Sequence, residues 1–253
     1  MRALVCIPTY NEAPNIHRVL PRVRAAVPDA TILVIDDGSP DGTADLAEAL
    51  GGELGQVEVL RRTEKQGLGA AYRAGFAWGL DHGFDVLVEM DADLSHDPDA
   101  LPELLAAIDD GATLAIGSRW VPGGMVVDWP RERLLLSRLG NFYARVGLQL
   151  PVRDATGGFR AYRAEVLREI DLSVVRSNGY AFQVEMAYRV LHLGGRIIEV
   201  PITFRERTEG VSKMSWHIIG EALKLVTAWG ARDRLRRLTG RGRRPQPAPA
   251  PSR

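Results

Sequence analysis

Strand-like and helix-like segments alternate through the first half of this 253-residue chain. Short apolar or β-branched runs predict strands, and longer stretches with apolar residues at helical spacing predict helices. Strands are expected over residues 4–7, 31–35, 57–60, 85–90 and 114–117. Helices are expected over residues 13–26, 68–80 and 98–108, with one more from Asp41 or Thr43 to Leu50. This order predicts right-handed βαβ units, and hence an α/β fold of Rossmann-like type with a mostly parallel sheet and helices on both faces.

The second half of the chain is expected to contain more helix. Helices are predicted over residues 132–148, 182–193 and 217–238, and a strand over residues 197–200. The segments 132–148 and 217–238 each have an apolar side, so both are predicted to be amphipathic. Residues 1–239 are therefore expected to form one domain. The remaining residues, 240–253, are rich in proline and arginine and have no apolar face, which predicts a disordered tail.

Composition excludes several classes of protein. The 32 lysines and arginines balance 32 aspartates and glutamates, so the chain lacks the positive charge typical of a nucleic-acid-binding protein. A single cysteine, Cys6, excludes an intramolecular disulfide. The sequence contains no run of about 18 uncharged apolar residues and no signal-peptide pattern after Met1. The protein is therefore expected in the cytoplasm, or attached to a membrane from the cytosolic side.

Ligands of a parallel sheet bind beyond the carboxyl ends of its strands. Three loops are predicted to lie at such ends, namely residues 8–12, 36–41 and 91–96. In the third loop, Asp91 and Asp93 are two residues apart, and side chains two apart in an extended chain lie on the same face. Two carboxylates placed in this way repel each other unless a cation lies between them. Their oxygen atoms suit Mg²⁺ or Mn²⁺, which protein carboxylates often bind together with substrate phosphates.

The two loops that contain aspartate pairs, 36–41 and 91–96, also have ordinary structural explanations. The Asp91 loop could be a polar turn in which Asp97 or Ser95 caps the next helix. In the loop at 36–41, Asp36 and Asp37 could form a self-capping turn, or a carboxylate there could accept hydrogen bonds from a nucleobase or a ribose. The position after a buried strand favours the metal and phosphate interpretation for Asp91 and Asp93.

The loop at 8–12 offers an aromatic ring and a carboxylate. Tyr10 could stack on a base and Glu12 could hydrogen-bond a nucleotide. Alternatively, this is an ordinary loop in which the helix dipole favours Glu12 in the first turn.

The glycine-rich stretch that begins at Gly67 does not match a dinucleotide-binding motif. Tyr72 occupies the third glycine position, and no acidic strand end follows about 20 residues later. We therefore interpret this stretch as a helix N-terminus that packs closely on the sheet.

Basic residues among turn formers could bind phosphate groups. Arginine suits bidentate phosphate binding and lysine supplies a compact charge. The basic residues in such positions are Arg119, Arg131, Arg133, Arg207 and Lys213. For most arginines of the chain a solvated surface charge is the simpler explanation, but Arg207 and Lys213 share a loop that contains glycine and serine.

Taken together, these segments resemble glycosyltransferase family 2, the inverting nucleotide-sugar transferases of the GT-A fold. The resemblance is to the polyprenol (dolichyl) phosphate mannosyltransferase branch, and it extends from Ile7 to Met214. The segments that carry it are IPTYNE, IDDGSPDGT, KQGLGAAYRAG, MDADLSHDP, GSRWVPGG, DATGGFRAY, GYAFQVEM and TFRERTEGVSKM. The DATGGF segment departs from the commoner Ser-Gly-Phe form, with Gly157 where serine is frequent, which leaves the part played by Asp154 open.

The resemblance implies transfer of mannose from GDP-mannose to a polyprenyl phosphate, with Mg²⁺ or Mn²⁺ as cofactor. The residues that would hold the guanosine are Pro8, Tyr10, Glu12, Ile35 and Asp37. The residues at the metal and diphosphate would be Asp91, Ala92, Asp93 and Ser95. The residues that would contact donor or acceptor phosphates are Arg119, Arg133, Arg207 and Lys213, with Arg133 and Lys213 on the acceptor. Of these, Asp93, Arg207 and Lys213 are the expected catalytic residues.

A phosphate acceptor is already anionic and needs no general base, whereas a hydroxyl acceptor would need a carboxylate such as Asp154. The same fold could use UDP-glucose or another donor, and a non-catalytic nucleotide-sugar-binding protein is a further alternative. A lipid substrate also requires access to a membrane surface. The segments 134–146 and 217–238 could lie in its interface, and the arginine-rich tail could bind anionic lipid or a partner membrane protein.

Overall fold

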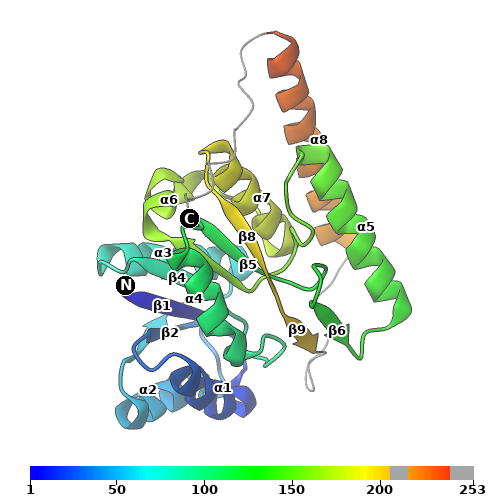
Figure 1. The fold of residues 1–253 in the computed structure, drawn as a ribbon. Coiled ribbons are helices and arrows are strands. Elements are labelled where there is room, and N and C mark those ends of the chain that lie inside the picture. The colour runs from blue at the N-terminus through cyan, green and yellow to red at the C-terminus, as the bar shows by residue number, and fades with distance from the viewer. Residues whose placement is uncertain (206–215, 240–253) are drawn as a thin grey trace.

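The computed structural model describes residues 1–205 and 216–239 (Figure 1). Within this part of the chain, seven strands form one sheet in the order β3-β2-β1-β4-β7-β5-β8. The strands are β1 (Ala3–Thr9), β2 (Thr31–Asp36), β3 (Val57–Arg61), β4 (Val86–Glu89), β5 (Leu114–Ser118), β7 (Arg160–Arg163) and β8 (Ile197–Pro201). Neighbouring strands are parallel except at β7, which is antiparallel to β4 and β5. The predicted fold class is therefore confirmed, whereas Arg207, Lys213 and the tail 240–253 lie outside the described residues.

The helices follow the predicted order, except that α6 was not predicted and α7 begins at Gly179, before the expected residue 182. They are α1 (Ala13–Ala26), α2 (Thr43–Leu54), α3 (Leu68–Asp81), α4 (Leu101–Asp109), α5 (Arg131–Leu148), α6 (Ala164–Glu169), α7 (Gly179–His192) and α8 (Trp216–Leu238). Short 3₁₀ segments, η1 (Pro98–Ala100) and η2 (Leu172–Val174), precede α4 and α7. A second, two-stranded parallel sheet pairs β6 (Met125–Val127) with β9 (Thr203–Arg205). The expected helix 98–108 is therefore a 3₁₀ turn followed by α4, and Asp97 caps that turn through the backbone N–H of Asp99.

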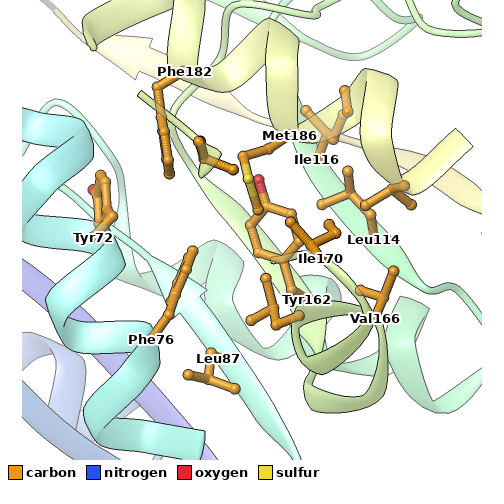
Figure 2. Packing of buried hydrophobic residues seen from close by; sticks show 14 of the residues in the cluster. Tyr72, Phe76, Leu87, Leu114, Ile116, Tyr162, Val166, Ile170, Phe182 and Met186 are labelled. Atoms are coloured by element: carbon orange, nitrogen blue, oxygen red, sulfur yellow. The ribbon is translucent and has the colours of Figure 1, made fainter. Parts of the chain in front are cut away.

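Two hydrophobic cores cover the two faces of the sheet because side chains alternate along each strand. On β1, Leu4 and Cys6 belong to one core, while Val5 and Ile7 belong to the other. Helices α1 and α4 close the second core, and α3, α6 and α7 close the first. Figure 2 shows the first core, where Tyr162 of β7 lies among side chains from all three of these helices.

Strand β7 was not predicted from the sequence, because two of its four residues are arginines. Arg160 is nevertheless fully buried. Its guanidinium donates hydrogen bonds to the backbone oxygens of Gly157 and Ala155 at 2.7 Å and of Gln183 at 2.6 Å. Backbone carbonyls therefore compensate a charge that would otherwise exclude this segment from the middle of the sheet.

Gly75 and Gly79 of α3 pack on the sheet, whereas the predicted glycine-rich stretch that begins at Gly67 packs elsewhere. A Cβ atom on Gly75 would lie 2.4 Å from Ile35 Cδ1, and one on Gly79 would lie 2.6 Å from Leu87 Cδ2. A side chain at either position would therefore push core side chains of β2 and β4 out of place. The start of the helix, by contrast, lies against the residues around the start of α7, since a Cβ atom on Gly69 would lie 2.6 Å from the backbone oxygen of Ser177, so the expected packing of this stretch on the sheet is wrong.

Helices α5 and α8 lie side by side at one edge of the molecule and also cross closely (Figure 1). A Cβ atom on Gly230 would lie 2.5 Å from the backbone oxygen of Gly147, and one on Gly147 would lie 2.7 Å from Val226 Cγ1. The Tyr143 hydroxyl and Thr227 Oγ1 are 2.7 Å apart at the same crossing. Among the described helices, none combines the length and the apolarity needed to cross a membrane.

We predict that Gly230→Ala destabilises the protein by about 1–3 kcal/mol, because the added methyl group meets backbone that has to move. Gly140→Ala, on α5, is the matched control, since a Cβ atom there meets no atom of a described residue within 4 Å. That variant should be neutral or up to about 1 kcal/mol more stable. Urea unfolding measures the free energy of unfolding of both variants. An equal loss of stability in the two variants would contradict the close crossing.

Candidate active site

A cavity of about 350 Å³ lies at the carboxyl ends of β1, β2 and β4. The predicted binding residues that line it are Pro8, Tyr10, Glu12, Asp37, Asp91, Ala92, Asp93, Ser95, Arg119 and Arg133. Ile35 does not line the cavity, because its side chain is fully buried against α3 in the first core. Residues from separate predicted loops are thus gathered in one place, as the rule for parallel sheets requires.

Several lining residues were not singled out from the sequence. They are Lys65, His96, Trp129, Thr156, Gly158, Asn178, Tyr180, Gln183 and Phe204. All of them except Trp129 and Asn178 belong to the family-like segments named above, which is a signal that could have found them. Trp129 and Phe204 reach the cavity through the small β6–β9 sheet, which no periodicity predicted.

One end of the cavity combines an aromatic ring, a carboxylate and cations. Lys65 Nζ lies 4.0 Å from the centre of the Tyr10 ring. Arg62 forms an ion pair with Asp37, and burial nevertheless raises the pKa of the Asp37 carboxyl. The adjacent Asp36 instead forms a structural turn, in which its carboxylate accepts hydrogen bonds from the Ser39 backbone N–H at 2.8 Å and hydroxyl at 2.6 Å. Asp37 is therefore the carboxylate of this pair that lines the cavity.

The loop that carries the two predicted metal ligands is a turn and not an extended strand. Strand β4 ends at Glu89, and Leu94 has a φ of 60°. The expectation that Asp91 and Asp93 share a face through extended spacing is therefore wrong, although both line the same cavity. The turn is fixed by the Asp91 N–H, which donates to His96 Nδ1 at 3.1 Å, and by the Ser95 N–H, which donates to Asp93 Oδ1 at 3.0 Å.

The turn offers oxygen atoms suited to a divalent ion. The Asp91 side chain is 36% exposed to the cavity side of the turn, while the Ser95 hydroxyl is buried and has no hydrogen-bond partner among the described residues. A buried hydroxyl without a partner fits a ligand that the protein itself does not supply. Among the described residues no three His, Cys, Asp or Glu side chains are placed to hold a metal ion together. Two carboxylates and one hydroxyl therefore suit Mg²⁺ or Mn²⁺, whose remaining ligands would be diphosphate oxygens and water.

Arg119 is held by a fully buried ion pair. Its Nε and Nη2 donate to the two carboxylate oxygens of Asp154 at 2.7 Å each, and its backbone N–H donates to Asp154 Oδ2 at 3.0 Å. Burial alone would raise the pKa of the Asp154 carboxyl, but Arg119 outweighs burial and lowers it. Asp154, whose role was left open, therefore holds Arg119 in place and has no free oxygen with which to act as a base.

A second, apolar cavity of about 90 Å³ adjoins the first. Its apolar wall comes from α5, α7 and α8, with Leu136, Tyr143, Ala144, Val184, Leu223 and Val226. The residues that line both cavities are Arg119, Trp129, Arg133, Thr156 and Tyr180. The Arg133 guanidinium lies 4.2 Å from the centre of the Trp129 ring. Two cations thus stand where a polar cavity meets an apolar one.

We predict that Asp154→Asn destabilises the protein by about 3–5 kcal/mol at pH 7, because the variant leaves a buried guanidinium without its counter-charge. The folded pKa of Asp154 is lowered, so its contribution is present above the unfolded value of about 4 and is lost as the pH falls below it. The difference in the free energy of unfolding between wild type and Asp154→Asn should therefore become smaller from pH 7 to pH 3. Chemical unfolding at several pH values measures it, and a gap that does not change with pH would refute this role.

Comparison with known proteins is consistent with this geometry. The family model described as "Glycosyl transferase family 2" matches residues 4–171. An undecaprenyl-phosphate mannosyltransferase of Micrococcus luteus is 54% identical over 241 residues, which cover 95% of this chain and 99% of that protein. A polyprenol monophosphomannose synthase of Mycolicibacterium smegmatis is 55% identical over 240 residues, which cover 94% of this chain and 91% of that protein.

Among solved structures, the mannosyltransferase PcManGT from Pyrobaculum calidifontis, in complex with GDP-Man and Mn²⁺, has a similar fold. The TM-score is 0.58 at 21% identity, over 97% of this chain and 66% of that one. A fold of this type, a matching family model and extensive identity to curated relatives agree with one another. The chain belongs to glycosyl transferase family 2 and is a glycosyltransferase.

Proposed function

We propose that the protein transfers mannose from GDP-mannose to a polyprenyl phosphate, with inversion, to give a polyprenyl β-mannosyl phosphate. The observation that carries this proposal is the junction of the two cavities, where Arg119 and Arg133 line both. An acceptor with an anionic head and an apolar tail matches a pair of arginines next to an apolar cavity. The names of the Micrococcus and Mycolicibacterium relatives support the same acceptor and the same sugar.

The donor would occupy the polar cavity. Its guanosine would lie by Tyr10 and Asp37, where a ring and a carboxylate are available for stacking and hydrogen bonding. Its diphosphate would lie at Asp91, Asp93 and Ser95, which would hold Mg²⁺ or Mn²⁺. The ion, when bound, supplies positive charge where negative charge develops on the leaving GDP. The Pyrobaculum neighbour, solved with GDP-Man and Mn²⁺, makes this donor and this ion the first pair to test.

The acceptor phosphate would approach from the junction. Arg133 would bind it, and Arg119 would contribute charge while Asp154 fixes its position. An acceptor phosphate oxygen then forms a bond with C1 of mannose as the bond from C1 to the GDP oxygen breaks, and the electron pair leaves with GDP. Among the described residues shared by the two cavities none is a carboxylic acid, which suits an acceptor that is already ionised. Arg207 and Lys213, outside the described residues, are proposed as further phosphate contacts from their motif position.

An apolar stripe on α5 would provide contact with the membrane that contains the lipid. Leu135, Leu139, Phe142 and Val146 recur on one side of the helix and are 51–64% exposed. The same helix contributes its other side to the apolar cavity. We therefore place α5 in the interface of the cytosolic membrane face, with the tail 240–253 as a second contact to anionic lipid or to a membrane protein.

We predict that Asp93→Asn lowers mannosyl transfer about 100-fold or more, because the variant weakens charge stabilisation of the leaving diphosphate. Asp97→Asn is the matched control, since Asp97 pairs with Arg22 and does not line the cavity. Labelled GDP-mannose, a short polyprenyl phosphate and Mn²⁺ followed by solvent extraction measure the product. Near-normal activity of Asp93→Asn would contradict the ion site, and thermal protection by UDP in place of GDP would favour a UDP-sugar donor.

Replacing Leu139 and Phe142 together by serine should weaken binding to vesicles of phosphatidylglycerol and phosphatidylethanolamine about tenfold or more. Each apolar side chain removed from water contributes about 1.5–3 kcal/mol. Leu193→Ser is the control, because Leu193 is 45% exposed but lies at the end of α7. Sedimentation with the vesicles measures binding, and an equal loss in the control would mean that α5 has no special part in it.

A further inference from the structure

A tryptophan lies beside both arginines at the junction of the two cavities. Trp129 lines the polar cavity and the apolar cavity, as Arg119 and Arg133 do. The centre of a Trp129 ring lies 4.2 Å from Arg133 Cζ and 5.3 Å from Arg119 Cζ. Both distances fall within the range of about 6 Å in which the face of an aromatic ring attracts a cation. One aromatic side chain therefore attracts both cations where the cavities meet.

The small β6–β9 sheet fixes the place of the Trp129 ring. Strand β6 ends at Val127, and Asp128, with a φ of 64°, turns the chain directly before Trp129. Phe204 of β9 packs edge-on against the Trp129 ring, with the ring centres 5.4 Å apart and the ring planes at 77°. Such edge-to-face contacts are favourable and directional. The two-stranded sheet thus holds this ring at the junction.

The two arginines differ in what else holds them. Arg119 is fixed by its two side-chain hydrogen bonds to the buried carboxylate of Asp154. Arg133 lies in the first turn of α5 and is half-buried. A free arginine side chain has many rotamers, and an anion binds well only when the side chain is confined to one of them. Because the ring is closer to Arg133 and Arg119 is already fixed by Asp154, the ring contact matters more for Arg133.

A contact with an aromatic face leaves a guanidinium able to bind an anion. The N–H donors of arginine lie in the plane of the guanidinium, whereas an aromatic ring attracts the cation through the ring face. The contact between Trp129 and Arg133 can therefore confine the cation without using the donors that a phosphate needs. Since both residues line both cavities, these donors belong to the place where an anionic head with an apolar tail would enter.

We propose that Trp129 is a positioning residue of the acceptor site, whose ring holds the Arg133 guanidinium so that its N–H groups meet the acceptor phosphate. Trp129 acts through Arg133, and it therefore governs the binding of the lipid acceptor and has little effect on the nucleotide-sugar donor. This inference rests on the proposed function and adds to it the side chain that orients a phosphate contact.

The test measures transfer from GDP-mannose to a short polyprenyl phosphate by wild type, Trp129→Leu and Trp129→Phe. In Trp129→Leu, KM for the polyprenyl phosphate should rise about 3- to 30-fold, as expected for the loss of a cation–π contact. KM for GDP-mannose and Kd for GDP should change by less than about twofold, because the donor does not depend on Arg133. Trp129→Phe keeps an aromatic face, so its KM for the lipid should stay within about threefold of wild type. An equal rise in both variants, or in KM for both substrates, would overturn the inference.

A double-mutant cycle shows whether Trp129 acts through Arg133. Arg133→Met alone should raise KM for the polyprenyl phosphate about tenfold or more, because a phosphate contact is lost. Adding Trp129→Leu to Arg133→Met should raise KM by a further factor of about two at most, because the ring then has no guanidinium to position. Multiplication of the two single effects would overturn the positioning role, since the ring would then act on the lipid directly.

Trp78→Leu is the matched control for the loss of a large aromatic side chain. Trp78, on α3, is partly buried against the first core and lines neither of the two cavities. This variant should lose stability but keep KM for the polyprenyl phosphate within about twofold of wild type. A rise in KM equal to that of Trp129→Leu would overturn the inference.

Binding of GDP checks that the polar cavity is intact in each variant. Should Trp129→Leu fail to bind GDP, Trp129→Met replaces it, because methionine also lacks a ring. Failure of both variants to bind GDP would overturn the inference, because Trp129 would then be needed for the polar cavity itself.

The outcomes also separate this inference from the function on which it rests. No transfer to polyprenyl phosphate by the wild type would overturn the proposed function and the inference with it. Transfer by the wild type, with an unchanged KM for the lipid in Trp129→Leu, would overturn only the role of Trp129.

Discussion

The Arg119 guanidinium is enclosed by protein, and Asp154 accepts hydrogen bonds from both its Nε and its Nη2. A buried charge of this kind is tolerated only when a partner compensates it. The pair joins the end of β5 to the loop before β7, and its cation borders both the polar and the apolar cavity. The same bonds that make the carboxylate unsuitable as a base therefore place a fixed positive charge where the two cavities meet.

Around that charge the site divides into parts with different chemistry. The carboxylates at the end of β4 suit an ion and a diphosphate, and the aromatic and acidic groups at the ends of β1 and β2 suit a nucleoside. The apolar cavity between α5, α7 and α8 suits a lipid, and Val226 of its wall contacts Gly147 at the close crossing of α5 and α8. The sugar, on this account, lies where the polar parts converge.

The sequence predicts most of this fold, because hydrophobic periodicity is local and the elements of a parallel sheet are long enough to show it. It did not predict β7, since the burial of Arg160 depends on carbonyls from residues 155, 157 and 183 that only the fold brings together. Nearly every predicted residue of the cavity could be found from its loop, because the loops at the carboxyl ends of parallel strands meet at one edge of the sheet. Ile35 does not line the cavity, and its strand-end position does not reveal which face its side chain occupies. Gln183 lines the cavity and belongs to the segment GYAFQVEM, but nothing in that segment shows which of its side chains face the cavity.

The central claim is that Asp91 and Asp93 hold a divalent ion in the cavity that also receives the nucleotide. Its most direct test is an anomalous difference map from crystals of the protein grown with GDP and Mn²⁺. The account predicts a manganese peak within coordinating distance of these carboxylates, bridged to the GDP phosphates, with the guanine near Asp37. A nucleotide and a manganese ion bound elsewhere, with the two side chains turned away from both, would contradict it.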